Sequence, residues 1–457
     1  MLLEESNMVN SLIEKARVAQ KEFESFDQNQ VDRIVREIGK VVYDNAESLA
    51  RMAIDETRMG VYEHKVAKNK GKAKVIWNDL RGKKSVGEIL RDPITNIVEI
   101  AKPIGVVGAV TPTTNPIVTP MCNAMFALKG RNAIIIAPHP RAKGCSTETV
   151  RLINERIEKL GAPKNIIQII CEPSIERTNE LMKQVDVIVA TGGMAMVKAA
   201  YSSGKPAFGV GAGNVQVIVD RNIDFSESAK KIIDGRIFDN GIICSGEQTV
   251  ISHKDDYTNV IKAFESHGAY LVSDKEDVRK ITETIFDGKH MNKGVVGQST
   301  LKIAQMAGVN IPEGTTVILL ESDKHGVDEI LCKEKMCPVL TMLKYNDFEE
   351  GIRKANDNLE MEGNGHSAAV HSNSLTNIKR VGEVLSVSRL VVNAPSATTA
   401  GGSFFNGFSP TTTLGCGSWG NNSISENFTY KHLINISRIG LIREDVVLMN
   451  DEQIWTA

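Results

Sequence analysis

Cys244 is the residue in this chain best suited to covalent chemistry. It lies in the glycine-punctuated segment 238–246, FDNGIICSG, between two series of predicted strands and helices, where a cleft between domains would form. A cysteine thiolate is intrinsically the best side-chain nucleophile toward a carbonyl group. Free cysteine is also among the most buried residue types. For Cys244 taken alone, a packing role is therefore the stronger interpretation.

Three other segments reverse that interpretation when they are taken together with Cys244. Segment 111–116, TPTTNP, follows a predicted strand and holds Asn115 between prolines, where its amide can donate to a developing oxyanion. Segment 191–193, TGG, also follows a strand and opens a helix, whose N-terminal amides can meet a phosphate. Segment 209–214, GVGAGN, lets backbone approach a flat ligand closely, although a glycine-rich hairpin would explain it equally. Each motif alone is weak evidence.

The elements that must position these groups are predicted from hydrophobic periodicity. Helical spacing runs from Val9 to Phe23 and through 31–59, and alternation over 89–103 indicates a β-hairpin or an extended arm. Two series of short β-branched runs then alternate with helical segments, which predicts two α/β domains with parallel sheets and a boundary near residue 240. The runs are 105–110, 133–137, 166–171, 185–190 and 215–219, then 249–252, 316–320, 339–344, 368–371 and 390–393.

Bulk properties exclude several classes of function. The 457 residues carry a net charge of -2, so nothing indicates a surface for nucleic acid or for an anionic membrane. Seven cysteines without CxxC spacing favour reduced thiols in a cytoplasm over disulfides or a metal site. Residues 1–21 lack the pattern of a signal peptide, and no apolar run is long enough to cross a bilayer. We expect small molecules and copies of the same chain as partners.

The motifs, in this order, resemble the aldehyde dehydrogenase superfamily. Over nearly the whole chain the resemblance is to its CoA-acylating branch, which includes acetaldehyde, succinate-semialdehyde and sulfoacetaldehyde dehydrogenases. The specific marks are 113–116 (TTNP), 137–140 (APHP), 199–204 (AAYSSG), 238–241 (FDNG) with Cys244, and 414–420 (LGCGSWG).

The resemblance implies the aldehyde dehydrogenase fold and its division into parts. A Rossmann-like nicotinamide-binding domain would cover 1–239, with a β-arm at about 88–103. An α/β catalytic domain would cover 240–428, and a C-terminal oligomerisation segment 429–457. Since family members pair such arms between subunits, a homodimer or a dimer of dimers is expected.

The resemblance also assigns roles to individual residues. Cys244 would be the nucleophile, Asn115 with the Cys244 backbone amide the oxyanion donor, and Glu334 the group that holds the nicotinamide ribose. His366 would help to deprotonate the CoA thiol, although a structural histidine is an equal interpretation. Substrate would meet Ser245, Thr398 and Thr399. The remaining residues of the cofactor surface would be Pro112, Thr113, Pro138, His139, Arg141, Thr191, Gly192, Gly193 and Gly211.

Position 209 differs from the hydrolytic relatives. Those enzymes carry a glutamate there, just ahead of a Leu-Gly-Gly-Lys-Asn run, which activates water against the thioester. Gly209 cannot act as a base, so the acyl-enzyme is expected to persist until CoA arrives, in a ping-pong cycle. For reaction near neutral pH, we expect the pKa of the Cys244 thiol to fall below its usual value of about 8.5.

Cofactor and aldehyde are predicted from neighbouring residues. Many NAD-selective relatives hold an acidic residue where this chain has Pro138-His139-Pro140-Arg141, so NADP is expected to be accepted as well as NAD. Segments 398–404 (TTAGGSF) and 120–125 (PMCNAM) resemble the enzymes for succinate semialdehyde and sulfoacetaldehyde, both anions. Hydroxyls and glycine amides could bind such an anion, or could only shape a small pocket.

Three alternatives to an acylating dehydrogenase that acts on an anionic aldehyde stay open. One is an acetylating acetaldehyde dehydrogenase, the second an acyl-phosphate reductase of the same superfamily, and the third a non-enzymatic protein on the same scaffold. The third would have no reason to keep Cys244, Asn115 and Glu334 together.

Overall fold

A five-stranded parallel sheet forms the centre of the N-terminal part of the protein. The computed structural model describes the backbone of residues 2–456 and the side chains of residues 8–456. The strand order is β5-β4-β3-β6-β7. The bounds are β3 (Val106–Thr111), β4 (Ala133–Pro138), β5 (Ile167–Ile169), β6 (Val187–Thr191) and β7 (Ala207–Val210). Every residue of β3 and β4 is buried, as expected for continuous apolar strands covered on both faces.

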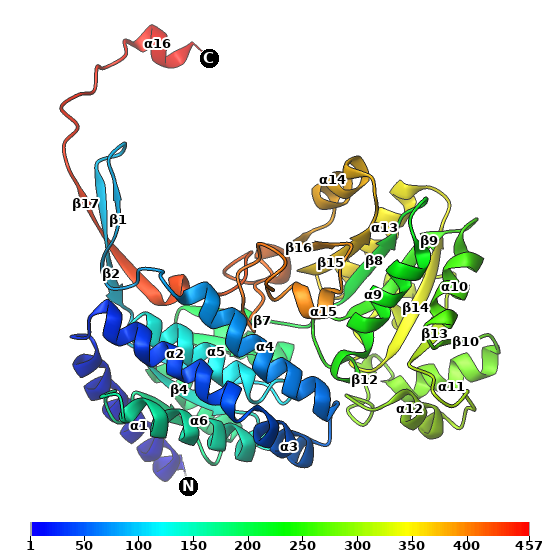
Figure 1. The fold of residues 1–457 in the computed structure, drawn as a ribbon, viewed down its shortest axis with the longest axis horizontal. Coiled ribbons are helices and arrows are strands. Elements are labelled where there is room, and N and C mark those ends of the chain that lie inside the picture. Colours follow the sequence, from blue (N-terminus) through cyan, green and yellow to red (C-terminus); the bar gives the residue numbers. More distant parts are fainter. Residues whose placement is uncertain (1, 457) are drawn as a thin grey trace.

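Helices cover both faces of this sheet (Figure 1). On one face α1 (Leu2–Phe23) packs with α7 (Ile175–Gln184). On the other lie α5 (Val118–Lys129) and α6 (Lys143–Glu158), and α5 is buried along its whole length because a further layer of helices covers it. That layer consists of α2 (Gln28–Asp44), α3 (Ala46–Thr57) and α4 (Tyr62–Leu80). A short helix, α8 (Met194–Tyr201), follows β6.

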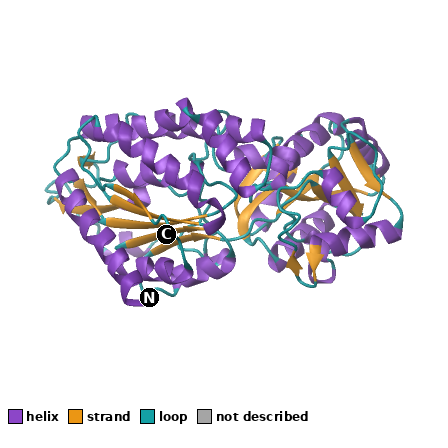
Figure 2. Cartoon of the chain, turned by 90° about the horizontal axis from the view of Figure 1, so that it is seen from below, coloured by secondary structure: helices purple, strands orange, loops and turns teal. Residues whose placement is uncertain are grey.

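A seven-stranded parallel sheet forms the second domain, in the order β10-β13-β14-β9-β8-β15-β16. Figure 2 shows the two groups of strands, each flanked by helices. The strands are β8 (Val215–Val219), β9 (Glu247–His253), β10 (Ala269–Val272), β13 (Val317–Glu321), β14 (Val339–Tyr345), β15 (Gly365–His371) and β16 (Val387–Val392). The other elements are α9 (Phe225–Ile237), α10 (Tyr257–Ser266), α11 (Lys275–Ile285), α12 (Thr300–Ala307), α13 (Phe348–Met361), α14 (Leu375–Val384), α15 (Ser396–Thr399) and the hairpin β11 (Phe286–Asp287) and β12 (His290–Met291).

The chain passes from one sheet to the other earlier than the sequence indicated. β8 pairs with β9 and β15 in the seven-stranded sheet, and α9 packs on α10 of the same domain. The chain therefore crosses between the sheets at residues 211–214, between β7 and β8, and not near residue 240 as expected. Periodicity identified the strand 215–219 correctly, but it cannot show which sheet a strand joins.

Three antiparallel strands form an arm that projects from the body (Figure 1). They are β1 (Gly87–Asp92), β2 (Ile97–Pro103) and β17 (Ile434–Gly440), in the order β1-β2-β17. The sequence predicted a β-hairpin or an extended arm over 89–103, and in the structure β2 of this hairpin also pairs with β17 from the C-terminal segment. Beyond the arm the chain continues to α16 (Asp451–Trp455), with exposed Val447, Leu448 and Trp455. Among the described residues, no helix is long and apolar enough to span a membrane.

Candidate active site

The predicted cofactor residues follow neighbouring parallel strands of the first sheet. Pro112 and Thr113 follow β3, Pro138 ends β4, and Thr191 ends β6, while Gly211 follows β7. Because these strands are parallel, their carboxyl ends meet at one edge, which is where open α/β sheets bind ligands. The topology thus brings together residues that are up to 99 positions apart in the chain, from 112 to 211.

The N-terminus of α8 has the open geometry that a phosphate needs. Gly193 is its N-cap, and a Cβ added at Gly192 or Gly193 would meet no atom within 4 Å. At Gly211 an added Cβ would lie 2.2 Å from Met194 Sδ, so a larger residue there would require the Met194 side chain to move. The residues present therefore fit a cofactor pyrophosphate at this end of α8.

Positive charge surrounds the residues that follow β4. His139 and Arg141 are both exposed there. Burial of its ring lowers the pKa of His139, and the charges of Arg141 and Lys293 act in the same direction. Arg141 and Lys293 therefore supply positive charge close to the end of β4, where the sequence has no acidic residue.

The chemical groups lie at the amino edge of the second sheet. Cys244 comes just before β9 and Glu334 before β14, and His366 is the second residue of β15. A Cβ added at Gly213, just before β8, would lie 1.8 Å from the Cys244 carbonyl oxygen and 3.2 Å from His366 Cε1. Four adjacent strands thus gather the predicted nucleophile, ribose ligand and histidine opposite the cofactor edge of the first sheet.

The expected low pKa of Cys244 is wrong for this structure. Burial of the thiol raises its pKa to about 12, and the charges of Glu334 and Cys416 raise it further, while Arg389 opposes them. The turn before Cys244 suggested only local dipoles. Burial and Glu334, which is 90 positions away in the chain, are effects that a short motif does not reveal.

Glu334 and His366 are both perturbed in the directions that burial dictates. Burial raises the pKa of Glu334 to about 8, helped by the Glu362 carboxylate and opposed by a hydrogen bond from the Gly213 backbone. Burial lowers the pKa of His366 to about 3, with Arg389 acting in the same direction. Its Nδ1 lies 3.1 Å from Ser367 Oγ, and its Nε2 has no hydrogen-bond partner among the described residues. His366 is therefore a neutral imidazole whose Nε2 has no partner among the described residues.

A cavity of about 340 Å³ opens onto Cys244. We call it the Cys244 cavity. Its wall includes Asn115, Ser245 and Thr398, as the sequence predicted, together with residues of α4 and of the loops 397–405 and 411–414. Thr399 does not line the cavity, since its hydroxyl donates to Pro395 O at 2.6 Å and so closes the first turn of α15. The predicted nucleophile and the predicted oxyanion donor thus line the same cavity.

Lys72 is the residue of this cavity that the sequence analysis missed. Its ammonium donates to Gly401 O at 2.8 Å and to Thr411 O at 3.1 Å, and no described carboxylate pairs with it. Burial lowers the pKa of Lys72 to about 8, although the Cys122 and Cys244 thiols oppose that shift. In the sequence, Lys72 is one of many lysines on a polar helix. The signal was the spacing of Lys65, Lys68 and Lys72, three and then four residues apart, which places the three lysines on one helix face.

Position 209 does not face the Cys244 cavity. A Cβ added at Gly209 would lie 2.7 Å from Val197 Cγ1 and 2.9 Å from Tyr201 Cε2, both on α8. A glutamate there would first have to displace these side chains, so this geometry does not support the expectation that position 209 is where a base would act on the thioester. Among the described residues that line the cavity there is no aspartate or glutamate.

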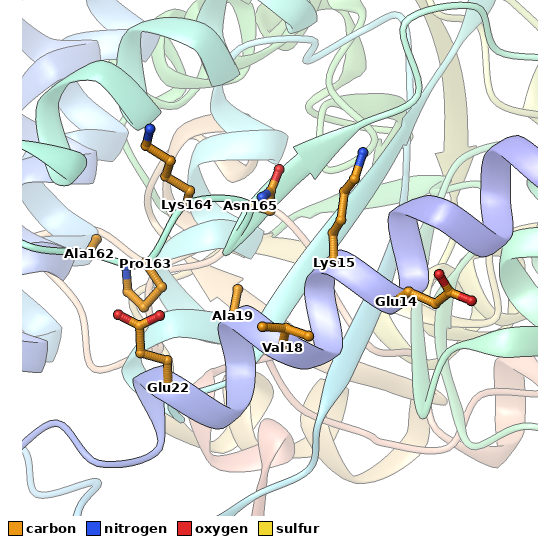
Figure 3. Close-up of a pocket in the computed structure, with 9 residues that line it drawn as sticks. All are labelled: Glu14, Lys15, Val18, Ala19, Glu22, Ala162, Pro163, Lys164 and Asn165. Carbon is orange, nitrogen blue, oxygen red and sulfur yellow. The ribbon is translucent and has the colours of Figure 1, made fainter.

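Two further features lie apart from this site. A groove of about 610 Å³ separates α1 from the turn before β5 and is lined by residues such as Lys15, Val18 and Lys164 (Figure 3). It contains no predicted site residue. Among the described residues, no group of three or more His, Cys, Asp or Glu could hold a metal ion.

Comparisons with known proteins agree with this geometry. A family model described as "Aldehyde dehydrogenase family" matches residues 3–433. The chain is 57% identical, over 447 residues and 98% of both chains, to a Clostridium kluyveri protein named succinate-semialdehyde dehydrogenase (acetylating). It is 41% identical over 435 residues to a sulfoacetaldehyde dehydrogenase of Acholeplasma sp, covering 94% of this chain and 90% of that protein.

A solved structure is also similar over the full length. The acetylating aldehyde dehydrogenase from Geobacillus thermoglucosidasius is 36% identical, with a TM-score of 0.94. The match covers 98% of this chain and 99% of that chain. The two-sheet architecture with its projecting arm is therefore that of a known type of enzyme.

Proposed function

Because the chain belongs to the CoA-acylating branch of the aldehyde dehydrogenase family, we propose that it interconverts a small anionic aldehyde and its acyl-CoA through a thioester on Cys244. The observation that carries the anionic substrate is the shared cavity of Cys244 and Lys72, an ammonium without a carboxylate partner among the described residues. Succinate semialdehyde and sulfoacetaldehyde are the two aldehydes that this chemistry favours.

Cys244 forms and breaks the covalent bonds of the cycle. In the oxidative direction its thiolate attacks the aldehyde carbon, and the resulting oxyanion accepts hydrogen bonds from Asn115 Nδ2 and the Cys244 amide. Loss of hydride converts the thiohemiacetal into a thioester. CoA thiolate then attacks the thioester carbon, and acyl-CoA leaves while the Cys244 thiolate is restored. The residues that follow the strands of the first sheet would hold a nicotinamide cofactor, which would supply the acceptor for this hydride, and we expect both NADP and NAD to serve.

In this scheme Glu334 accepts the Cys244 proton, and His366 binds the CoA thiol. With a pKa of about 8, Glu334 changes its protonation state near the working pH, so it can take the Cys244 proton before it holds the nicotinamide ribose. His366 stays neutral, and its free Nε2 can accept a hydrogen bond from the CoA thiol. Glu334 is the one carboxylate assigned a role at Cys244, and no described aspartate or glutamate lines the cavity, which supports transfer of the acyl group to this thiol rather than to water.

The decisive experiment measures acyl-CoA reduction with a panel of substrates. Succinyl-CoA, sulfoacetyl-CoA and acetyl-CoA are each tested with NADH and NADPH, and succinyl phosphate replaces the CoA ester in a parallel series. Higher kcat/KM for the two anionic acyl-CoAs supports the proposal. Preference for acetyl-CoA would make the protein an acetylating acetaldehyde dehydrogenase, and preference for the acyl phosphate would make it a reductase of that class.

The pH dependence of substrate binding follows from Lys72. Its ammonium exists below its pKa of about 8 and is lost as the pH rises through that value. We therefore expect KM for succinyl-CoA to be constant between about pH 6.5 and 7.5 and to rise about tenfold per pH unit above 8. Acetyl-CoA serves as the control, because its KM should not follow this profile. Parallel profiles for both substrates would contradict the role of Lys72.

Oligomer formation is expected from the arm. β17 is an outer strand of the arm, and Ile436, Ile439 and Leu441 are exposed on or directly after it. Free strand edges and apolar surface of this kind are usually covered. We expect a homodimer or a dimer of dimers by multi-angle light scattering at micromolar concentration. A mass of one chain, 49.9 kDa, would contradict this expectation.

A further inference from the structure

One buried carboxylate, that of Asp239, ties the loop that carries Cys244 to helix α4. Asp239 Oδ1 accepts a hydrogen bond from Val61 N at 2.8 Å. Its Oδ2 accepts from Lys65 Nζ at 3.0 Å and from Lys68 Nζ at 2.5 Å. The side chain of Asp239 is fully buried, and those of the two lysines are nearly so. An ion cluster so thoroughly removed from water is costly unless every partner is satisfied, and here both carboxylate oxygens are used.

The backbone of residues 239–241 has a strained conformation, which neighbouring residues must stabilise. Asp239, Asn240 and Gly241 have φ angles of 53°, 52° and 75°, three successive residues in the left-handed region. For the two non-glycine residues that conformation costs about 1 kcal/mol or more each. Strain of this kind persists only where the surroundings fix it, and it clusters at active sites.

Contacts from three separate segments fix the turn. Asp239 N donates to His64 Nδ1 at 2.9 Å, and the His64 ring stacks on Phe238. Asn240 Nδ2 donates to Gly297 O at 2.9 Å. Arg236 Nη2 donates to Gly241 O at 3.1 Å. Cys244 follows three residues later, so any movement of this turn moves the nucleophile.

The same helix face reaches the Cys244 cavity. Lys68, which binds Asp239, lines the cavity, and Lys72 lies one turn farther along α4. Gly60 packs directly against this carboxylate, because a Cβ at position 60 would lie 2.0 Å from Asp239 Oδ1. Asp239 therefore pairs with both lysines that precede Lys72 on this face, and it holds the nucleophile loop against the helix that carries Lys72.

We propose that Asp239 is a positioning residue for catalysis: its carboxylate locks the left-handed turn 239–241 onto α4 and so sets the place of Cys244 relative to Asn115 and Lys72. This inference rests on the proposed role of Cys244 as nucleophile. The competing interpretation is a purely structural ion cluster, which would contribute to folding but not to the rate of the folded enzyme.

The test variant is Asp239→Asn in the full-length protein. Asparagine has the same shape and tolerates the left-handed region, but it cannot pair with two ammonium groups. With succinyl-CoA and with acetyl-CoA, kcat of the folded protein is expected to fall about 100-fold, since a misplacement of about 1 Å costs that much. KM for NADPH should change less than about threefold, because the cofactor edge belongs to the first sheet.

Asp186→Asn is the matched control. The Asp186 carboxylate also accepts from a backbone amide, Val106 N at 2.8 Å, and pairs with Arg17 at 2.9 Å. It lies before β6, at the opposite edge of the first sheet from the cofactor residues. It should lower the melting temperature without changing kcat of the folded protein. Equal losses of kcat in the two variants, or a kcat of Asp239→Asn within about twofold of wild type, would overturn the proposal.

Two further measurements cover poor folding and a wrong assignment of the reaction. If Asp239→Asn does not fold, the half-buried His64 replaces it as target: His64→Ala should lower kcat about tenfold, and His64→Asn, whose Oδ1 can replace Nδ1 as acceptor, should restore it. The alkylation rate of Cys244 by iodoacetamide needs no turnover. A change of more than about fivefold in Asp239→Asn and not in Asp186→Asn supports positioning even if no acyl-CoA is a substrate, and equal rates would refute it.

Discussion

Cys244→Ala is expected to abolish acyl-CoA reduction, with a loss of kcat on the order of 10⁴-fold or more, because it removes the only step that makes the covalent thioester. Binding of NADPH should persist, since the cofactor residues follow strands of the other sheet. The measurement is absorbance of the reduced cofactor with succinyl-CoA, together with a fluorescence titration of NADPH.

Cys171→Ala provides the control for thiol loss, because Cys171 is exposed and follows β5, an edge strand of the first sheet. It should retain full activity. The thiol that could replace Cys244 is Cys416, which is buried and close enough to influence the pKa of Cys244. Residual turnover in Cys244→Ala that disappears only when Cys416 is also replaced would show that the nucleophile was assigned to the wrong thiol.

The sequence predicted the fold well where local pattern determines structure. The apolar runs at 133–137 and 215–219 became β4 and β8 because continuous β-branched residues suit a strand covered on both faces. It missed β7 and β10, which are only four residues long, and β7 ends in a glycine-rich segment that resembles a loop. The domain boundary moved because sheet membership is a long-range property.

The site was predicted in part for the same physical reason. Cys244 and Asn115 carry recognisable local motifs, and the structure places both in one cavity. Lys72 carries none, because a lysine on a polar helix is usually solvated and its role appears only when α4 packs over the loop 401–411. The pKa of Cys244 was predicted in the wrong direction, since burial outweighs any effect of the adjacent turn.

Lys72→Met is expected to change which acyl-CoA the enzyme prefers. Methionine keeps most of the length and apolar stem of lysine but removes the charge in the Cys244 cavity. A hydrogen bond to a charged group contributes about 1.5 to 3 kcal/mol, so kcat/KM for succinyl-CoA should fall about 10- to 100-fold. For acetyl-CoA, kcat/KM should change by less than about threefold, because the acetyl group carries no charge for Lys72 to bind.

The ratio of the two kcat/KM values is the informative quantity. Lys72 also donates to Gly401 O and Thr411 O. Its loss leaves Thr411 O without that donor, while Gly401 O still accepts from Thr411 N, and activity toward every substrate falls to some extent. Dividing one value by the other removes that common effect. Lys70→Met is the matched control, since Lys70 lies on the same helix but pairs with Glu47. If Lys72→Met lowers both values equally, Lys72 only supports the loop, and the preference for an anionic aldehyde must come from the hydroxyls and backbone amides of 397–405.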